Sequence, residues 1–202
     1  MSKGRLSILI ILIVLFVDQA LKIWIKTTMM IGEEHHIFGD WFILHFTENN
    51  GMAFGFEFAG KIGKYFLSIF RIVAVSFIGV YIFKIIKKDL PLGFIVSVSL
   101  IFAGATGNII DSLFYGLIFN HSHYQIAQLL PETGVYGKFL QGKVVDMLYF
   151  PIIKGHWPSW SPINPREQFI FFRPVFNIAD SAISIGMFII ILFYKKVLKQ
   201  EV

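Results

Sequence analysis

The sequence predicts an all-α membrane protein, a bundle of four transmembrane helices with a small extracytoplasmic β-rich element and an interfacial insertion. Three observations predict this fold class. Hydrophobic residues make up 55% of the 202 residues, the mean hydropathy is +0.67, and long apolar runs recur along the chain. Only 15% of the residues are charged, compared with about a quarter in soluble domains. We therefore expect residues 1–202 to form a single integral membrane domain.

The four apolar runs are each close to the ~20 residues that cross a bilayer. They place the expected helices at residues 6–25, 65–83, 92–115 and 178–194. The first run could be a signal peptide, but no small-residue cleavage site follows it. Trp24 and Lys26 instead look like the interfacial anchors of a retained helix.

Basic residues near the helix ends predict the topology, because the cytoplasmic flanks of membrane helices are enriched in Lys and Arg. Four spans put both termini on one side of the membrane. The basic flanks on that side are Lys3, Arg5, Lys84, Lys87, Lys88, Lys195, Lys196 and Lys199. We therefore expect cytoplasmic N- and C-termini, with extracytoplasmic segments over residues 26–64 and 116–177.

The two outer segments differ in pattern. Residues 41–46 alternate like a strand and are followed by the turn-prone Asn49-Asn50-Gly51, which indicates a small sheet at the membrane surface. The second segment is rich in Pro and Trp, which predicts irregular structure resting on the interface. These residues are Trp157, Pro158, Trp160, Pro162 and Pro165.

Composition excludes several kinds of chemistry and partner. Cysteine is absent, which excludes disulfides, thiolate metal sites and a cysteine nucleophile. The net charge of +5 does not indicate a nucleic-acid partner, because the basic residues flank apolar segments instead of forming a soluble basic domain. Any hydrolytic chemistry must use oxygen or nitrogen groups.

Polar residues gather at the outward ends of three expected helices. They are Asp18 and Lys22 on the first helix, Gly104, Gly107, Asn108 and Asp111 on the third, and Asn177 and Asp180 on the fourth. Carboxylates in membrane helices are costly, so they usually face a protein interior or a wet cavity and mark function. This layer therefore indicates a site at the outer leaflet.

Each of these residues also has a purely structural interpretation. The first-helix pair, four residues apart, could be only an ion pair. Asn177 and Asp180 fit the N-cap and third position of a helix. Asp111 could be a carboxyl group hydrogen-bonded between helices, and Asp146 could be an ordinary loop aspartate. Periodicity alone does not select a catalytic pair.

Five short motifs follow one another along the chain. They are Asp18-Gln19-Ala20-Leu21-Lys22, Asn49-Asn50-Gly51-Met52-Ala53-Phe54, Gly104-Ala105-Thr106-Gly107-Asn108-Ile109-Ile110-Asp111, Val144-Val145-Asp146 and Phe176-Asn177-Ile178-Ala179-Asp180. Together they resemble the motifs of the lipoprotein signal peptidases, also called type II signal peptidases. Any one motif would be weak evidence, but five in the family's order are hard to obtain by chance.

The resemblance implies an aspartyl endopeptidase of the bacterial inner membrane, with Asp146 and Asp180 as the catalytic pair. It implies site-support or substrate-binding roles for Asp18, Lys22, Asn49, Gly51, Ala53, Phe54, Gly107, Asn108, Asp111, Asn177 and Ala179. The implied substrate is a prolipoprotein whose lipobox cysteine already carries diacylglycerol and which is cut just before that cysteine. No cofactor or metal is implied, membrane lipids are the other partner, and we expect a monomer.

Two features depart from the family pattern. Ser112 stands where the family usually has Arg, which puts in doubt any contact of that Arg with substrate or lipid. Residues 116–141 form an insertion before the Val-Val-Asp motif. Its His121 and His123 could bind a metal, although exposed histidines are common.

A transporter or channel that uses the same carboxylates is the main alternative from another functional class. A conduction path should continue across the bilayer, yet residues 6–16 and 187–193 in the inner halves of two helices carry no ionisable group. Arg71 in the second helix is more easily explained as an interhelical tie, or as a partner for a carboxylate, than as a conducting residue. A structural membrane subunit is the second alternative. A measurement of activity separates all three.

Overall fold

The structure is a computed structural model, and it describes residues 1–50, 60–132, 134–156, 158–160, 162, 168–171 and 173–197. Its helices are α1 (Lys3–Thr28), α2 (Gly60–Ile85), α3 (Leu92–Ile110), the π-helical turn η2 (Asp111–Tyr115), α4 (Gly116–Ile118) and α5 (Ile178–Phe193).

Three helical spans are long and apolar enough to cross a membrane, namely Lys3–Thr28, Gly63–Ile85 and Leu92–Ile118. This confirms three of the four expected transmembrane helices by length and composition. The fourth, α5, is apolar but has 16 residues, fewer than the ~20 that a perpendicular crossing needs. Its crossing of the membrane therefore stays a prediction.

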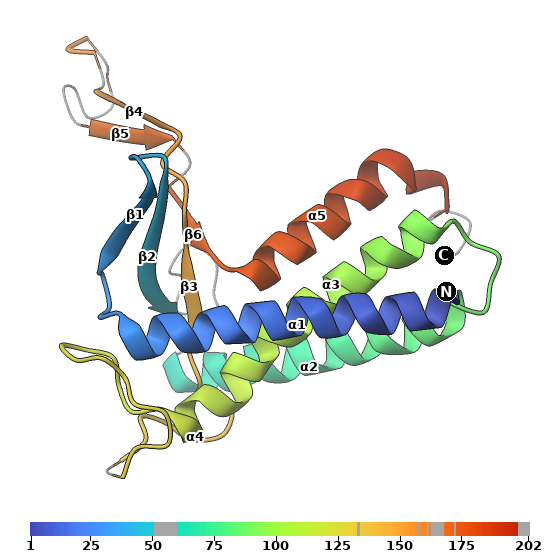
Figure 1. Cartoon of the computed structure of the whole chain (residues 1–202), viewed down its shortest axis with the longest axis horizontal. Helices are drawn as coiled ribbons and strands as arrows, with labels where there is room; N and C mark the ends of the chain where they lie inside the picture. The colour runs from blue at the N-terminus through green and yellow to red at the C-terminus, as the bar shows by residue number, and fades with distance from the viewer. Residues whose placement is uncertain are drawn as a thin grey trace.

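The helices form a bundle in which the N-terminus and the C-terminal end of α5 lie at the same end, beside the turn between α2 and α3 (Figure 1). α5 packs along α3, and two glycines allow the close approach. A Cβ atom at Gly104 would overlap the backbone oxygen of Ala179, and one at Gly186 would lie 2.6 Å from the backbone oxygen of Ser97. Small residues at such a crossing let two helix backbones touch.

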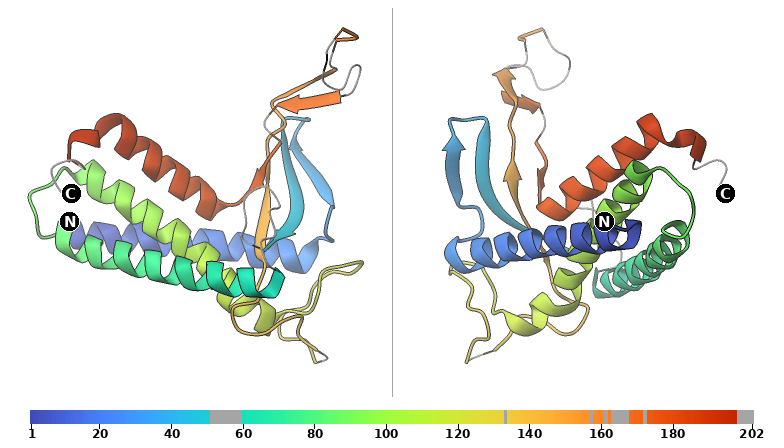
Figure 2. Two further views of the ribbon diagram at one scale, coloured as in Figure 1. Left: turned by 180° about the vertical axis from the view of Figure 1, so that it is seen from behind. Right: turned by 45° about the vertical axis from the view of Figure 1, so that its right-hand side comes forward.

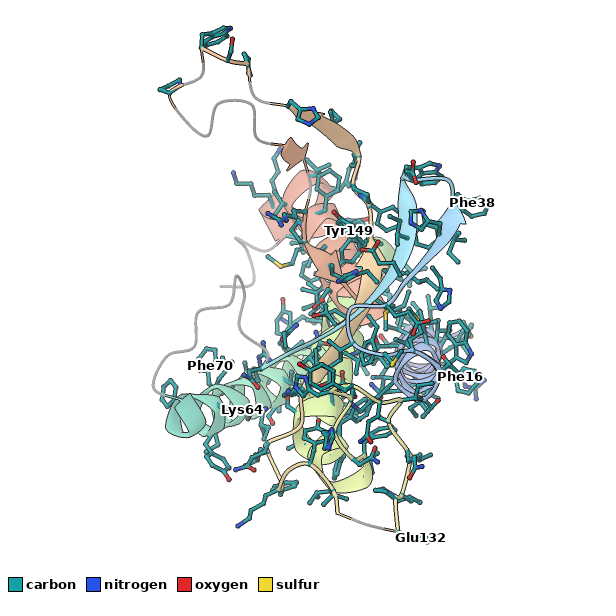
Figure 3. The ribbon with its side chains drawn as sticks, turned by 90° about the vertical axis from the view of Figure 1, so that its left-hand side faces the viewer. Phe16, Phe38, Lys64, Phe70, Glu132 and Tyr149 are labelled. Carbon is teal, nitrogen blue, oxygen red and sulfur yellow. The ribbon has the colours of Figure 1, made fainter. Side chains whose placement is uncertain are left out.

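An antiparallel sheet lies across the opposite end of the bundle (Figure 2). Its strands are β1 (Glu34–Phe38), β2 (Phe42–Asn49), β3 (Val144–Tyr149) and β6 (Val175–Phe176), in the order β1-β2-β3-β6. The small β-rich element expected from residues 41–46 is therefore confirmed. Figure 3 views the molecule with this sheet toward the reader.

The second outer segment also contains strands that its Pro- and Trp-rich pattern did not predict. This segment supplies β3 and β6, and it adds a separate antiparallel pair, β4 (Ile153–His156) with β5 (Gln168–Phe171). The strand partners of β3 are β2, about a hundred residues earlier, and β6. Pairing over such a distance leaves no local signal beyond the apolar character of the strand itself.

A buried apolar cluster joins the sheet to the bundle. It includes Ile25 and Met29 of α1, Leu44 and Phe46 of β2, and Tyr115 of η2. Two residues of the insertion, Phe119 and Ala127, belong to the same cluster. The insertion is therefore packed against the end of the bundle, and this packing fixes the sheet over the ends of α1 and α3.

Candidate active site

Asp146 lies in the middle of β3, a strand whose residues are almost all buried. The structure thus rules out the interpretation of Asp146 as an ordinary loop aspartate. The residue is 3% exposed, and each oxygen of its carboxylate accepts a hydrogen bond. The Asn177 amide donates to one oxygen at 2.7 Å, and the Asn49 amide donates to the other.

Burial raises the pKa of Asp146 to about 7, and the nearby Asp180 carboxylate adds to the rise. The Lys22 ammonium and the two amide donors act in the opposite direction. Two carboxyl groups that repel each other's charge hold a shared proton more tightly than either would alone. Asp146 is therefore a group that can exchange a proton near neutral pH.

Asp180 lies in the first turn of α5, where Asn177 is the N-cap. The Asn177 side-chain oxygen accepts from the Asp180 backbone N–H at 2.9 Å, and the Asp180 carboxylate accepts from the Asn177 N–H at 3.4 Å. The capping interpretation of these two residues is thus confirmed as a capping box. It does not exclude a second role, because the other oxygen of Asp180 points to another partner.

Asn108 of α3 joins the surroundings of the two aspartates. Its amide nitrogen donates to Asp180 at 2.8 Å. Its side-chain oxygen accepts from Asn177 at 3.1 Å and from the Lys22 ammonium at 2.9 Å. Since an ammonium can only donate, Lys22 fixes which end of the Asn108 amide faces Asp180.

Lys22 is a fully buried cation with a partner for each of its three N–H bonds. It donates to Asp18 at 2.9 Å, to Asp111 at 2.8 Å and to Asn108. The ion-pair interpretation of Asp18 and Lys22 is confirmed, and Asp111 is paired with the same Lys22. A buried carboxylate without such a partner would cost several kcal/mol.

Asp18 and Asp111 also accept hydrogen bonds from the backbone of the two segments that carry Asp180 and Asp146. Asp18 accepts from the Ala179 N–H at 2.9 Å, and Asp111 accepts from the Val145 N–H at 3.3 Å. Each contact lies one residue before an aspartate of the candidate pair. The Lys22 cluster therefore helps to set the positions of β3 and α5 relative to α1 and α3.

Gln19 and Tyr115 are members of the site that residue types and spacing did not single out. Gln19 donates to Asp18 at 3.1 Å, to Asp111 at 2.9 Å and to the Gly107 backbone oxygen at 3.2 Å, and it accepts from the Tyr115 hydroxyl. Gln19 stands inside the first motif, so its place beside Asp18 was the available signal.

A second buried ion pair lies next to this site. Lys26 of α1 bonds Glu48 of β2, and the Ser122 hydroxyl of the insertion bonds both. The Lys26 ammonium also lies over the rings of Phe119 and Tyr136. Glu48 directly precedes Asn49, so this pair fixes the end of β2 that supplies a donor to Asp146.

The structure brings most of the sequence-predicted site residues into one polar network, but not all can be described. Gly51, Ala53 and Phe54 lie outside the described residues. Ser112 is buried, and its hydroxyl donates to the Asn108 backbone oxygen at 3.0 Å. It therefore does not take over the role of a cation. Among the described residues, no group of three or more His, Asp or Glu side chains is arranged to hold a metal ion.

The site contains two carboxyl groups, Asp146 and Asp180, that are linked through the amides of Asn177 and Asn108. The pKa of Asp146 lies near neutral pH. Such a pair can take a proton from water and give one to a carbonyl oxygen. General acid–base hydrolysis is therefore the chemistry that these residues can perform without a cofactor.

Residues 10–195 match the family model described as Signal peptidase (SPase) II. The chain is 49% identical over 197 residues to the lipoprotein signal peptidase of Porphyromonas gingivalis. The matched region covers 97% of this chain and 85% of that protein. It is 36% identical over 196 residues to the lipoprotein signal peptidase of Amoebophilus asiaticus, with coverage of 96% and 79%.

Two solved structures of bacterial membrane enzymes are also similar to this chain. A bacterial membrane enzyme determined by the in meso method at 1.9 Å resolution has a TM-score of 0.59 and 29% identity, covering 93% of this chain and 91% of that chain. A second such enzyme, at 2.3 Å resolution, has a TM-score of 0.60 and 27% identity, covering 96% and 90%.

Proposed function

The chain belongs to the signal peptidase II family, and from this membership we propose that it is an aspartyl endopeptidase with Asp146 and Asp180 as its catalytic pair. Its substrate is a diacylglyceryl-modified prolipoprotein, cut just before the lipobox cysteine. No cofactor takes part in this mechanism.

One observation carries the proposal, the amide link between the two carboxyl groups. Asn177 donates to Asp146, Asn108 donates to Asp180, and the two asparagines bond each other at 3.1 Å. Asn108 is in turn bonded to the buried Lys22. This arrangement holds the two carboxyl groups in fixed orientations, as a preorganised acid–base pair requires.

In the proposed reaction the two aspartates share one proton. The ionised carboxylate removes a proton from a water molecule as its oxygen attacks the scissile carbonyl carbon, and the protonated carboxyl gives its proton to the carbonyl oxygen. Collapse of the tetrahedral intermediate breaks the C–N bond, and a proton passes to the leaving amine. The protons belong to the pair, so the acid and base roles are not assigned to one residue at each step.

We further propose that the enzyme works as a monomer with both termini in the cytoplasm and the site at the outer leaflet. The basic flanks of the helices support this orientation. The N-terminus, the basic α2–α3 turn and the C-terminal end of α5 lie at one end of the bundle, and the sheet that carries Asp146 lies at the other (Figure 1). A scissile bond at the end of a signal-peptide helix would lie in that same layer.

The transporter or channel alternative has no support in the comparisons, since the relatives are peptidases and the similar structures are membrane enzymes. The described carboxylates of the network lie close together and are linked by shared partners, namely Lys22, Asn108 and Gln19. This suits a fixed site better than a path for ions.

The experiment that tests the proposal is cleavage of a purified diacylated prolipoprotein by wild type, Asp146→Asn, Asp180→Asn and the double variant. We expect each single variant to lose at least about a thousandfold in turnover, with the double variant little worse, because the pair acts as a unit. Asp89→Asn, at a fully exposed carboxylate of the α2–α3 turn, is the matched control. Near wild-type turnover in either single variant would exclude the aspartyl mechanism.

A further inference from the structure

An aromatic ladder runs along the sheet from the active site to the tip of the β1–β2 hairpin. It begins at Phe176, the residue before Asn177, and continues through Phe150 at a ring-centroid distance of 5.7 Å and Phe42 at 4.7 Å. It ends at Phe38 and Trp41, whose rings stack at 6.0 Å. Both terminal rings are exposed, at 59% and 58%.

The ladder lies on the side of the sheet that faces the helices. Phe42, Phe150 and Phe176 all pack against the buried cluster that contains Ile25 and Met29 of α1. Leu44 and Leu148, which are directly paired, belong to the same cluster. Phe42 and Phe150 are two residues away from this pair along their chains, so they point to the same side. Phe176 is the direct partner of Leu148 and shares that side.

The opposite side of the same sheet carries the buried Ile43 and Met147 and, beside them, hydrogen-bonding groups. His45 bonds Glu34 at 2.7 Å and lies against the Tyr149 ring. These residues alternate with Leu44 and Leu148 along the two strands. Toward the free end of the sheet, the rings of the ladder therefore pack toward the bundle, and the His45–Glu34 pair and Tyr149 lie on the other side.

The hairpin tip extends beyond the helices. In the view of Figure 3, in which α1 is seen nearly end-on, Phe38 lies well above that helix. Since α1, α2 and α3 are long and apolar enough to cross the bilayer, the side of the sheet that rests on their ends faces the membrane. Past the edge of the bundle, that side has the lipid surface opposite it.

We infer that the aromatic ladder, ending in Phe38 and Trp41, is a membrane-surface anchor that inserts into the headgroup region of the adjacent leaflet. Trp settles at this depth because its ring is apolar and its N–H is polar. Phe is typical of the apolar face of segments that lie in the interface. Through Phe176 the anchor is joined to Asn177, so the depth of the hairpin sets the height of the catalytic layer relative to the lipid. This inference goes beyond the cleavage reaction and holds on whichever side of the membrane the sheet lies.

The test uses tryptophan fluorescence of the full chain in vesicles of phosphatidylethanolamine and phosphatidylglycerol that contain brominated lipid. Replacing Trp24, Trp157 and Trp160 by Phe leaves Trp41 as the single tryptophan. We expect strong quenching, greater with bromine near the headgroup than near the chain end. Full accessibility of Trp41 to aqueous iodide, without quenching by bromolipid, would overturn the inference.

The matched control moves the tryptophan to the opposite side of the same sheet, as Trp41→Phe with Tyr149→Trp in the same background. This variant should show iodide quenching and little bromolipid quenching. Equal bromolipid quenching at both positions would show that the sheet is not oriented as inferred.

Activity gives a second, independent result. Phe38→Ser with Trp41→Ser should keep its kcat/KM in detergent micelles but lose several-fold in kcat/KM in vesicles, because only the vesicle presents a leaflet at a fixed height. An equal loss in both media would assign the ladder to substrate binding and overturn the lipid anchor. The Trp41 quenching result does not depend on whether these serine variants fold.

Discussion

The side-chain amide of Asn177, at the start of α5, donates a hydrogen bond of 2.7 Å to the Asp146 carboxylate in β3. The same side chain caps α5 through its oxygen. A helix start and a sheet strand are thus held together by one residue, and that residue lies between the two aspartates of the proposed pair.

The first prediction separates these two functions of Asn177. Asn177→Ala should lower both thermal stability and turnover, since a lost N-cap alone costs about 1 kcal/mol. Asn177→Ser keeps a capping oxygen but is too short to donate to Asp146. It should therefore keep most of the stability and still lose turnover. Melting temperature and kcat, measured on both variants, check this, and equal turnover in Asn177→Ser and wild type would contradict it.

The second prediction concerns the pH dependence of stability. The pKa of Asp146 rises from an ordinary 3.8 to about 7 on folding, so ionisation favours the unfolded state as pH increases between these values. The cost is nearly absent below pH 4 and fully present above pH 7, where it is roughly 4 kcal/mol. Asp146→Asn should therefore melt higher than wild type at pH 8, with the difference shrinking toward pH 5. A constant difference across this range would show that burial of the charge is not the cause.

The third prediction is that Asp111 supports the site without doing the chemistry. Asp111→Asn should lower thermal stability or substrate affinity and keep measurable turnover, because an amide retains the shape and much of the hydrogen bonding. Lys22→Met should be worse, since it leaves two buried carboxylates without their cation, at a cost of about 3–5 kcal/mol. If Asp111→Asn folds stably and binds substrate but is as inactive as the Asp146 variant, Asp111 must be counted among the catalytic residues.

The fourth prediction concerns Lys26 and Glu48. Although burial opposes ionisation, the Lys26 ammonium and the Ser122 hydroxyl hold the pKa of Glu48 below its ordinary 4.5. The pair contributes stability above that pH and loses it as pH falls through the lower, folded value. Lys26→Met or Glu48→Leu alone should cost about 3–5 kcal/mol, whereas the double variant should recover much of the loss. Chemical denaturation of all four proteins forms the double-mutant cycle, and additive losses would argue against a coupled pair.

The fifth prediction tests the topology. The chain has no cysteine, so single cysteines can be introduced without background. A cysteine at Ser2 should resist a membrane-impermeant thiol reagent in intact cells, whereas one at Ser159 should react. Labelling at Ser2 in intact cells would reverse the assigned orientation, and lysed cells provide the control for reactivity.

The sequence alone determined the features that depend on local composition. Long apolar runs specify membrane helices because about 20 residues must avoid water, and three of the four runs have the expected length and apolar character in the structure. The alternation of residues 41–46 predicted β2, and the spacing of Asn177 and Asp180 predicted a helix cap. The five motifs were sufficient to indicate the family, because motif order does not depend on contacts.

Tertiary structure decided what those residues touch. Asp146 is a buried strand residue because β3 pairs with β2 and β6, partners that no local pattern specifies. Lys22 can bond Asp18, Asp111 and Asn108 at the same time only because α1 packs against α3. The raised pKa of Asp146 likewise follows from burial and from Asp180, which is 34 positions later in the numbering. Burial and long-range pairing depend on the whole chain, so neither is determined by the residues of one segment.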